Sequence, residues 1–276
     1  MPRLNLGTFE IEYQEYGASG EPVVLVHGSW GDRRQWDAVV ARLAESCRVI
    51  SYDRRGHGAS TSPGGSVAIA NHVGDLSTLL TVAGRGARHV VGTGEGGVIA
   101  LQLALTRPDL VRSVHAHEPS LLGLLSADPQ AHDLLVSARS VEAAAAARLG
   151  SGDPRGAAST FVDGSSAAGE GWDAFPPAVQ TSFTSNALAS SREVADPTTQ
   201  TMELSQFTSY RDPVLLTTGG RSAAAHRGVT DRVADAFYRP LRYQYPEGGH
   251  FPHVTRPDEC VRVVAEFCQF ARQQTG

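Results

Sequence analysis

The stretch HVVGTGEGGVIAL, residues 89–101, has the residue types of a turn that presents a nucleophile. A short apolar run leads into a glycine-rich turn, and apolar residues at helical spacing follow it. Such a strand–turn–helix unit usually carries Ser, Cys or Asp at its apex, where the side chain attacks an electrophilic carbon. Counting from Gly92, the apex is Gly94, which has no side chain. The sequence therefore predicts a site built to hold a nucleophile, without the nucleophile.

The composition excludes several other chemistries. The chain has 276 residues, a net charge of -5 and no lysine, so neither a nucleic-acid surface nor lysine-based catalysis is expected. Cys47, Cys260 and Cys268 lack the spacing of a disulfide frame or a zinc site, and we expect no metal and no cofactor. The chain has no signal-peptide core and no apolar run of about 18 residues. We therefore expect a cytoplasmic protein without a membrane partner, and a homodimer stays open.

The elements that must position this turn follow from the hydrophobic pattern. Strands are predicted over 8–16, 22–28, 48–53, 89–92, 111–119, 212–220 and 241–250. Helices are predicted over 34–46, 67–84, 96–106 and 256–273. The run 22–28 is apolar throughout, which is typical of a strand buried on both faces of a parallel sheet. Because strands alternate with helices, we expect crossover connections and a doubly wound, mainly parallel α/β sheet.

Residues 120–211 interrupt this alternation, because they lie between two predicted core strands and carry no strand pattern. They include strong helix formers such as VEAAAAARL (141–149), and they are too numerous for a loop in a compact domain. We therefore expect an inserted helical cap over 120–211, on a core formed by 1–119 and 212–276.

Four motifs carry a resemblance to a known family. They are VLVHGSWGDRRQW, SYDRRGHGAS, HVVGTGEGGVIALQLAL and GGHFPHV, in this order. The chain resembles the α/β-hydrolase superfamily, in its esterase-like serine-hydrolase branch with a helical cap, over nearly all residues outside the cap. The resemblance implies an α/β-hydrolase sheet with Gly94 at the nucleophile position. A one-residue shift would put Glu95 at the apex, but the VVG run before the turn and the GG pair after it favour Gly94.

The resemblance also implies an oxyanion hole beside the apex. One backbone N–H would come from Glu95 and the other from Ser29 or Trp30, in the HGSWG loop that follows the strand 22–28. Two N–H groups aimed at one point stabilise the charge that develops on a carbonyl oxygen. His27 is expected to be structural, bonding to the backbone beneath this loop. The side chain of Glu95 would border the pocket.

His250 stands at the position of the family's catalytic base, and histidine suits this role because its free pKa is near neutrality. His253 is a weaker candidate for the base. At the family's usual position for the acid this chain has Ser222. Some members take the acid from the end of the preceding strand, so we expect Glu118 to orient His250.

The pocket is expected to take its walls from Trp30 and from aromatic residues of the cap. These are Trp172, Phe175, Phe183 and Phe207. Aromatic residues at helical spacing also form cap cores, and this alternative stays open. The loop residues Arg54, Arg55 and His57 are expected to be structural rather than to touch substrate. An aromatic wall favours a small to medium-sized apolar small-molecule substrate.

Three functions are compatible with a missing nucleophile. The first is a hydrolase for an apolar ester, lactone or related carbonyl compound, whose apex serine has been replaced by Gly94. The second is a cofactor-free lyase, isomerase or oxygenase that uses His250, which could also activate a water to hydrolyse a reactive bond. The third is a non-catalytic ligand-binding protein. The first is favoured, since GTGEGG differs from the common family string GTSEGG at one residue.

Overall fold

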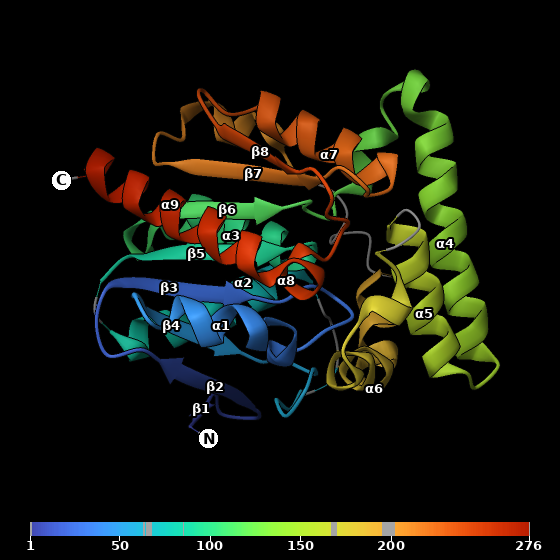
Figure 1. Cartoon of the computed structure of the whole chain (residues 1–276), viewed down its shortest axis with the longest axis horizontal. Helices are drawn as coiled ribbons and strands as arrows, with labels where there is room; N and C mark the ends of the chain where they lie inside the picture. The colour runs from blue at the N-terminus through green and yellow to red at the C-terminus, as the bar shows by residue number, and fades with distance from the viewer. Residues whose placement is uncertain are drawn as a thin grey trace.

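The computed structural model describes residues 2–62, 64, 68–84, 86–166, 170–194 and 202–275. In these residues a central sheet lies between two layers of helices, and a further group of helices stands beside one end of the sheet (Figure 1). The predicted α/β-hydrolase sheet is confirmed in this part of the chain. Val67, where the second helix was expected to begin, lies outside the described residues, as do 167–169 and 195–201 of the expected cap.

The described strands form one eight-stranded sheet in the order β1-β2-β4-β3-β5-β6-β7-β8. Their bounds are β1 (Arg3–Asn5), β2 (Glu10–Tyr16), β3 (Glu21–Val26), β4 (Cys47–Tyr52), β5 (Arg88–Thr93), β6 (Val111–His117), β7 (Val214–Gly219) and β8 (Leu241–Tyr245). β1 and β2 pair antiparallel, and so do β2 and β4, whereas every pairing from β4 to β8 is parallel. The three-residue β1 was not predicted, because so short a strand leaves no alternating pattern.

Helices cover both faces of the sheet, because the parallel strands are apolar on both sides. The core helices are α1 (Asp37–Leu43), α2 (Ile69–Ala83), α3 (Glu95–Thr106), α7 (Ala224–Asp235), α8 (Pro252–Thr255) and α9 (Pro257–Thr275). Val23 and Leu25 of β3 belong to the hydrophobic cluster of α1 and α9. Val24 and Val26 belong to the cluster of α2, α3 and α7 on the other face. This alternation confirms that β3 is buried on both faces.

The cap consists of three helices, α4 (His132–Gly150), α5 (Pro154–Ser165) and α6 (Pro177–Val194), which Figure 1 shows beside the sheet. Its hydrophobic cluster also contains Trp30, Phe251 and Val254 of the core, and Leu134, Leu135 and Ala138 of α4 pack against the large core cluster. The cap therefore has apolar contacts with the core at both places. No helix of the described residues combines the length and the hydropathy that crossing a bilayer would require.

The backbone segments pack closely together around the turn after β5. A Cβ on Gly96 would lie 2.2 Å from the carbonyl oxygen of Val26, and a Cβ on Gly92 would lie 2.2 Å from the carbonyl oxygen of Gly96. Real Cβ atoms do not approach backbone oxygens so closely. Glycine at both positions therefore lets α3 begin in direct contact with β3 and β5.

This packing predicts opposite effects of two glycine-to-alanine changes on the free energy of unfolding. Gly96→Ala should destabilise the protein by about 1–3 kcal/mol, because the new methyl group meets rigid backbone. The matched control is Gly74→Ala in α2, where a Cβ meets no atom within 4 Å and alanine should stabilise the helix by about 0.5–1 kcal/mol. Urea unfolding measures both changes, and equal stabilities would contradict the packing.

Candidate active site

Gly94 forms the turn between β5 and α3, with a backbone φ of 54° and ψ of -121°. Its N–H donates to the carbonyl oxygen of His117 at 2.9 Å, and its own carbonyl accepts from the N–H of Ser120 at 3.3 Å. These bonds hold the turn against the end of β6. A Cβ on Gly94 would lie 3.7 Å from Nε2 of His250 and 3.2 Å from Oγ of Ser120. A side chain at this apex would therefore reach the imidazole of His250.

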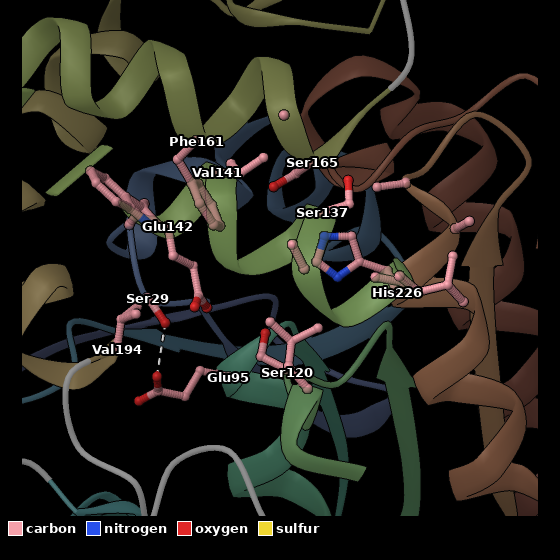
Figure 2. Close-up of a pocket in the computed structure, with 18 residues that line it drawn as sticks. Ser29, Glu95, Ser120, Ser137, Val141, Glu142, Phe161, Ser165, Val194 and His226 are labelled. Carbon is pink, nitrogen blue, oxygen red and sulfur yellow. Dashed lines mark hydrogen bonds between the residues drawn. The ribbon is translucent and has the colours of Figure 1, made fainter. Parts of the chain in front are cut away.

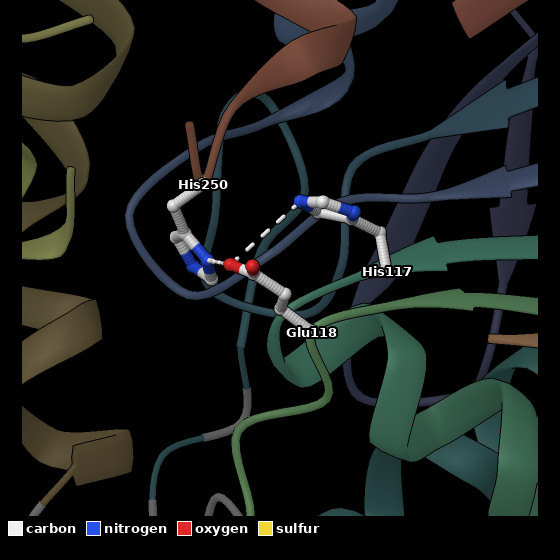
Figure 3. A group of neighbouring side chains, drawn as sticks. All are labelled: His117, Glu118 and His250. Carbon is white, nitrogen blue, oxygen red and sulfur yellow. Dashed lines mark hydrogen bonds and ion pairs between the residues drawn. The ribbon is translucent and has the colours of Figure 1, made fainter. Parts of the chain in front are cut away.

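The candidate base and acid follow two different strands and meet in the interior (Figure 3). Oε2 of Glu118, directly after β6, lies 2.6 Å from Nδ1 of His250, which lies in the loop after β8. The other carboxylate oxygen accepts from the N–H of Gly219 at 2.8 Å. The structure thus brings together the two residues that were expected to form the base–acid pair.

The protonation of this pair leaves the correct nitrogen free. Burial alone would raise the pKa of Glu118, but the neighbouring His117 and the hydrogen bond from His250 lower it to about 2. Glu118 is therefore a carboxylate at neutral pH, and Nδ1–H of His250 donates a hydrogen bond to it. Nε2, the nitrogen that faces the apex, then carries a lone pair when the imidazole is neutral. Such a nitrogen can accept a proton from a nucleophile.

Glu118 is held in an unusual backbone conformation, with a φ of 43°, and it is the only described non-glycine residue with a positive φ. This conformation costs of order 1–3 kcal/mol and persists only where the surroundings impose it. The bonds from Gly219 and His250 to its carboxylate are the local constraints that impose it.

A second histidine lies against the candidate base. The ring of His226, in α7, stacks on the ring of His250 with centroids 4.2 Å apart and an angle of 15° between the planes. Burial is the main cause that lowers the pKa of His226 to about 3, so this ring is neutral at physiological pH. The sequence analysis missed His226, because nothing in the pattern of α7 distinguishes it from an ordinary helix residue.

The candidate oxyanion donors surround a small cavity over the apex. Glu95 is the first residue of α3, so its N–H has no acceptor within the helix and lies at the positive end of the helix dipole. Ser29 and Trp30 lie in the loop after β3. The cavity measures about 20 Å³, and the residues nearest the apex that line it are Ser29, Trp30, Gly94, Glu95, Ser120 and His250.

A larger cavity of about 110 Å³ adjoins this chamber (Figure 2). The two share the lining residues Ser29, Trp30, Glu95, Ser120 and Phe161. The larger one continues beneath the cap, where its walls are Leu122, Leu134, Ser137, Ala138, Val141, Glu142, Ser165 and His226, among others. Its walls are mainly apolar, so it fits an apolar group of a small molecule better than a charged one.

The aromatic pocket walls differ from the prediction. Trp30 and Phe183 line the small chamber, but the main aromatic wall is Phe161, which stacks on Trp30 with centroids 4.9 Å apart. Trp172 and Phe175 pack together inside the cap and line neither of these two cavities. These two fit the alternative that cap aromatics form its core.

Phe207 lines neither of the two cavities described above. It lies in a short 3-10 helix, Leu204–Ser209, and packs on Phe237 with ring centroids 4.5 Å apart. Both rings belong to the large core cluster that contains residues of α7, and not to the cluster of the cap. The role of Phe207 as a pocket wall stays a prediction.

A buried arginine lies beneath the oxyanion loop. The side chain of Arg54 is 0% exposed and donates from Nη1 to Glu95 and to Glu193, at 2.9 Å in both cases. A second bond joins its Nη2 to Glu193 at 2.9 Å. Arg54 lines neither described cavity near the apex, in agreement with the structural role expected for it.

Arg54 binds both Glu95 and Glu193, and these two carboxyl groups differ in their protonation. Burial and the neighbouring Glu193 raise the pKa of Glu95 to about 8. The pKa of Glu193 is lowered instead, since Arg54, bound by two bonds, outweighs the effect of burial. Glu193 is therefore charged at neutral pH, whereas Glu95 holds a proton.

Among the described residues, two clusters contain side chains of the types that bind metals, and the other bonds of these side chains leave neither cluster free to take an ion. His72, Glu95 and Glu193 converge, but the guanidinium of Arg54 already lies at hydrogen-bond distance from both carboxylates. A metal cation there would have to displace a buried positive charge. In the other cluster the short bond between Glu118 and His250 already uses the nitrogen and oxygen that face each other.

His27 bonds to the backbone beneath the oxyanion loop, as expected. Its Nε2 accepts from the N–H of Arg54 at 2.9 Å, and its Nδ1 lies 2.7 Å from the carbonyl oxygen of Gly28. His253 packs on Trp36 with centroids 4.5 Å apart and lines neither cavity described above.

The raised pKa of Glu95 predicts a specific pH dependence of stability. Between about pH 4.5 and 8 the folded protein keeps a proton that the unfolded chain has released, so this group lowers the free energy of unfolding as pH rises. The slope is at most about 1.4 kcal/mol per pH unit. Glu95→Gln removes this contribution, so its stability relative to the unaltered protein should increase across this window.

Urea unfolding at a series of pH values measures that difference. The exposed Glu45→Gln serves as the control and should follow the unaltered protein at every pH. A Glu95→Gln curve parallel to that of the unaltered protein would show that Glu95 is ionised in the folded state.

Comparisons with known proteins agree with the fold and the motifs. The sequence model described as the alpha/beta hydrolase family matches residues 23–263. The uncharacterized hydrolase YraK of Bacillus subtilis is 36% identical over 129 residues, which cover 44% of this chain and 47% of the relative. The chain thus spans less than half the length of this curated relative.

Solved structures share the fold over almost the whole chain at low sequence identity. A thermophilic esterase from Thermogutta terrifontis has a TM-score of 0.79 and 19% identity, with 98% of this chain and 99% of that one covered. Est816, described as an N-acyl homoserine lactone degrading enzyme, has a TM-score of 0.77 and 22% identity, with 96% and 100% covered. With the family match over most of its length, the chain belongs to the alpha/beta hydrolase family.

Proposed function

We propose that this chain hydrolyses a small to medium-sized apolar ester, lactone or related carbonyl substrate, with His250 as the general base. The distance of 3.7 Å between Nε2 of His250 and the apex Cβ position is the observation that supports this most directly. It means that the base faces the point from which a nucleophile attacks, although Gly94 supplies none. Glu118, bonded to Nδ1, orients the ring.

In this proposal the nucleophile is a water molecule above Gly94. The chamber of about 20 Å³ is large enough for one water, which needs roughly 10–15 Å³ of such space and several polar partners. Nε2 of His250 and Oγ of Ser120 both lie within 4 Å of the apex Cβ position and are the partners on two sides. The apex glycine therefore makes room for the water that replaces the side chain.

The reaction then follows general-base hydrolysis. Nε2 of His250 takes a proton from the water as the water oxygen bonds to the carbonyl carbon. The N–H groups of Glu95 and of the loop after β3 stabilise the negative oxygen that forms. When the intermediate collapses, the carbon–oxygen bond to the leaving group breaks, and the imidazolium returns the proton to the departing alkoxide. The products are a carboxylic acid and an alcohol, or one hydroxy acid from a lactone.

The substrate class rests on the larger cavity and on the relatives. The apolar walls beneath the cap suit an acyl or alcohol group without charge, and the volume suits a compact one. Similar folds include a protein described as an esterase and one described as a lactone-degrading enzyme. The alternatives are a cofactor-free lyase, isomerase or oxygenase and a protein that only binds its ligand.

Replacing the base should remove the activity. His250→Ala is expected to lower kcat on activated esters and lactones by about 10²–10⁴-fold, the usual contribution of a positioned acid–base group. His253→Gln, a change of a buried histidine outside the two cavities, is the control and should keep kcat. Release of p-nitrophenol from short-chain esters measures both.

The products distinguish the alternatives. Turnover that depends on His250 but yields no acid and alcohol would support the cofactor-free reaction. A ligand that binds equally well to the unaltered protein and to His250→Ala, without any turnover, would support the binding protein.

Restoring a hydroxyl at the apex should change the route of hydrolysis. Gly94→Ser places Oγ close to Nε2 of His250, so we expect faster ester hydrolysis through a covalent acyl-enzyme. Gly94→Ala is the matched control, because it carries the same strain at positive φ, of order 1–3 kcal/mol, without the hydroxyl.

Intact-protein mass spectrometry during turnover of p-nitrophenyl acetate detects the adduct. We expect an added acetyl group in Gly94→Ser and none in the alanine variant or the unaltered protein. Fast hydrolysis in Gly94→Ala equal to that in Gly94→Ser would contradict the proposed position of the base.

A further inference from the structure

We propose that the cap helix α6 completes the oxyanion hole, because Ser190 holds the peptide group between Ser29 and Trp30 in the orientation that presents the N–H of Trp30 to the substrate. This inference rests on the proposed function. It assigns a positioning role to a cap residue that touches neither of the cavities described above.

Two side chains contact the carbonyl of Ser29. It accepts from Oγ of Ser190 at 2.6 Å and lies 2.7 Å from Nε2 of His57. Ser190 is 0% exposed and His57 is 1% exposed, so both groups act away from solvent. Two side chains from different parts of the chain therefore fix the direction of one carbonyl group.

The N–H of Trp30 belongs to the same peptide group as the carbonyl of Ser29. The described chain contains no cis peptide bond, and in a trans peptide the C=O and N–H point in opposite directions. The carbonyl of Ser29 points to Ser190 and His57, which line neither chamber, so the N–H of Trp30 points the opposite way. Trp30 itself lines both chambers.

The neighbouring peptide, between Gly28 and Ser29, is held by different groups. The carbonyl of Gly28 lies 2.7 Å from Nδ1 of His27 and accepts from Nη2 of Arg54 at 3.2 Å. Both of these groups belong to the core, and the cap reaches this carbonyl only indirectly, through the bonds between Glu193 and Arg54. The carbonyl of Ser29, in contrast, accepts directly from Ser190 of the cap.

The helix α6 carries buried polar side chains on one face. Four of its polar side chains are buried and recur at helical spacing, which places them on one face. This face, called the α6 polar face below, consists of Ser182, Asn186, Ser190 and Glu193.

The α6 polar face contacts the two loops beneath the apex at several points. Asn186 accepts from the N–H of Gly58 at 3.0 Å and donates to Asp32 at 3.1 Å. Glu193 binds Arg54, which in turn bonds to Glu95 beside the apex. Oγ of Ser29 donates to that same Glu95 at 2.8 Å. The cap is therefore docked on the oxyanion loop through directional bonds.

Directional bonds constrain orientation more closely than apolar packing does. A buried hydrogen bond contributes only about 0.5–1.5 kcal/mol to stability, and buried ion pairs are weak evidence for stability. An oxyanion donor, in contrast, affects kcat by about 10²–10³-fold when it is lost. A polar face buried at this position thus serves the geometry of the hole more than the stability of the cap.

The test compares two adjacent serines of α6. Ser190→Ala removes the 2.6 Å bond to Ser29 together with a longer contact, 2.9 Å, of the same hydroxyl to the carbonyl of Asn186 within the helix. Ser191→Ala removes only a hydroxyl that donates to the carbonyl of Leu188 within the helix, so it controls for the loss of such an intrahelical bond. We expect Ser190→Ala to lower kcat by about tenfold, the equivalent of one lost hydrogen bond, with KM nearly unchanged. Ser191→Ala should keep both values.

A second measurement does not require turnover. A phosphonate monoester of the substrate has a tetrahedral anionic centre like that of the intermediate, and a ketone of the same shape resembles the ground state. By calorimetry, Ser190→Ala should weaken binding of the phosphonate by about the same factor as kcat, and leave binding of the ketone unchanged.

The outcomes separate this inference from the proposed function. If the unaltered protein hydrolyses esters and Ser190→Ala matches it in kcat and in phosphonate affinity, the positioning role is wrong and the function stands. Lower thermal stability of Ser190→Ala without those two losses also overturns the role, because it indicates only docking. If the unaltered protein neither hydrolyses esters nor prefers the phosphonate to the ketone, both proposals fail.

Discussion

Gly94 joins β5 to α3 at a backbone φ of 54°, in a turn where the helix begins in contact with the backbone of β3. Because the helix starts so close to the sheet, the N–H of Glu95, the loop after β3 and the end of β6 come within reach of one point. Glu118 and His250 are then brought to the same point by β6 and β8. The geometry of the site depends on this turn, which forms although Gly94 carries no side chain.

The protonation states of the buried carboxyl groups around the turn depend on a few hydrogen bonds and ion pairs. Glu118 stays charged because the neighbouring His117 and the hydrogen bond from His250 lower its pKa, whereas burial and the neighbouring Glu193 raise the pKa of Glu95 and keep that group neutral. The pocket therefore presents a neutral carboxyl group beside the apex and a charged one behind the base. A neutral carboxyl group beside the apex agrees with the uncharged substrate proposed above.

Most of the fold could be predicted from local patterns. A continuous apolar run indicates a buried parallel strand, whichever strands pair with it. The glycines at 92, 96 and 97 indicate that a strand and the following helix pack closely together. The pairing of Glu118 with His250 was also expected, because the resemblance to the α/β-hydrolase superfamily implies an acid at the end of the strand before the usual position. The catalytic roles of these residues stay predictions.

What the sequence could not reveal depends on contacts between distant segments. Phe161 and Phe207 are both aromatic residues of the segment 120–211. Phe161 lines the cavity, whereas Phe207 packs on Phe237 in the core. The α6 polar face resembles a solvent-exposed helix face in the sequence, since buried and exposed serines look alike until the partner loop is known. His226 beside the base was missed for the same reason.

The central claim is that a substrate carbonyl is attacked over Gly94 by a nucleophile that His250 deprotonates. A crystal structure of the unaltered protein with a bound phosphonate monoester tests it most directly. We expect the phosphorus above Gly94, one oxygen bonded to the N–H groups of Glu95 and Trp30, and another oxygen facing Nε2 of His250. A phosphonate bound elsewhere, or bound with His250 turned away from it, would contradict the proposed mechanism.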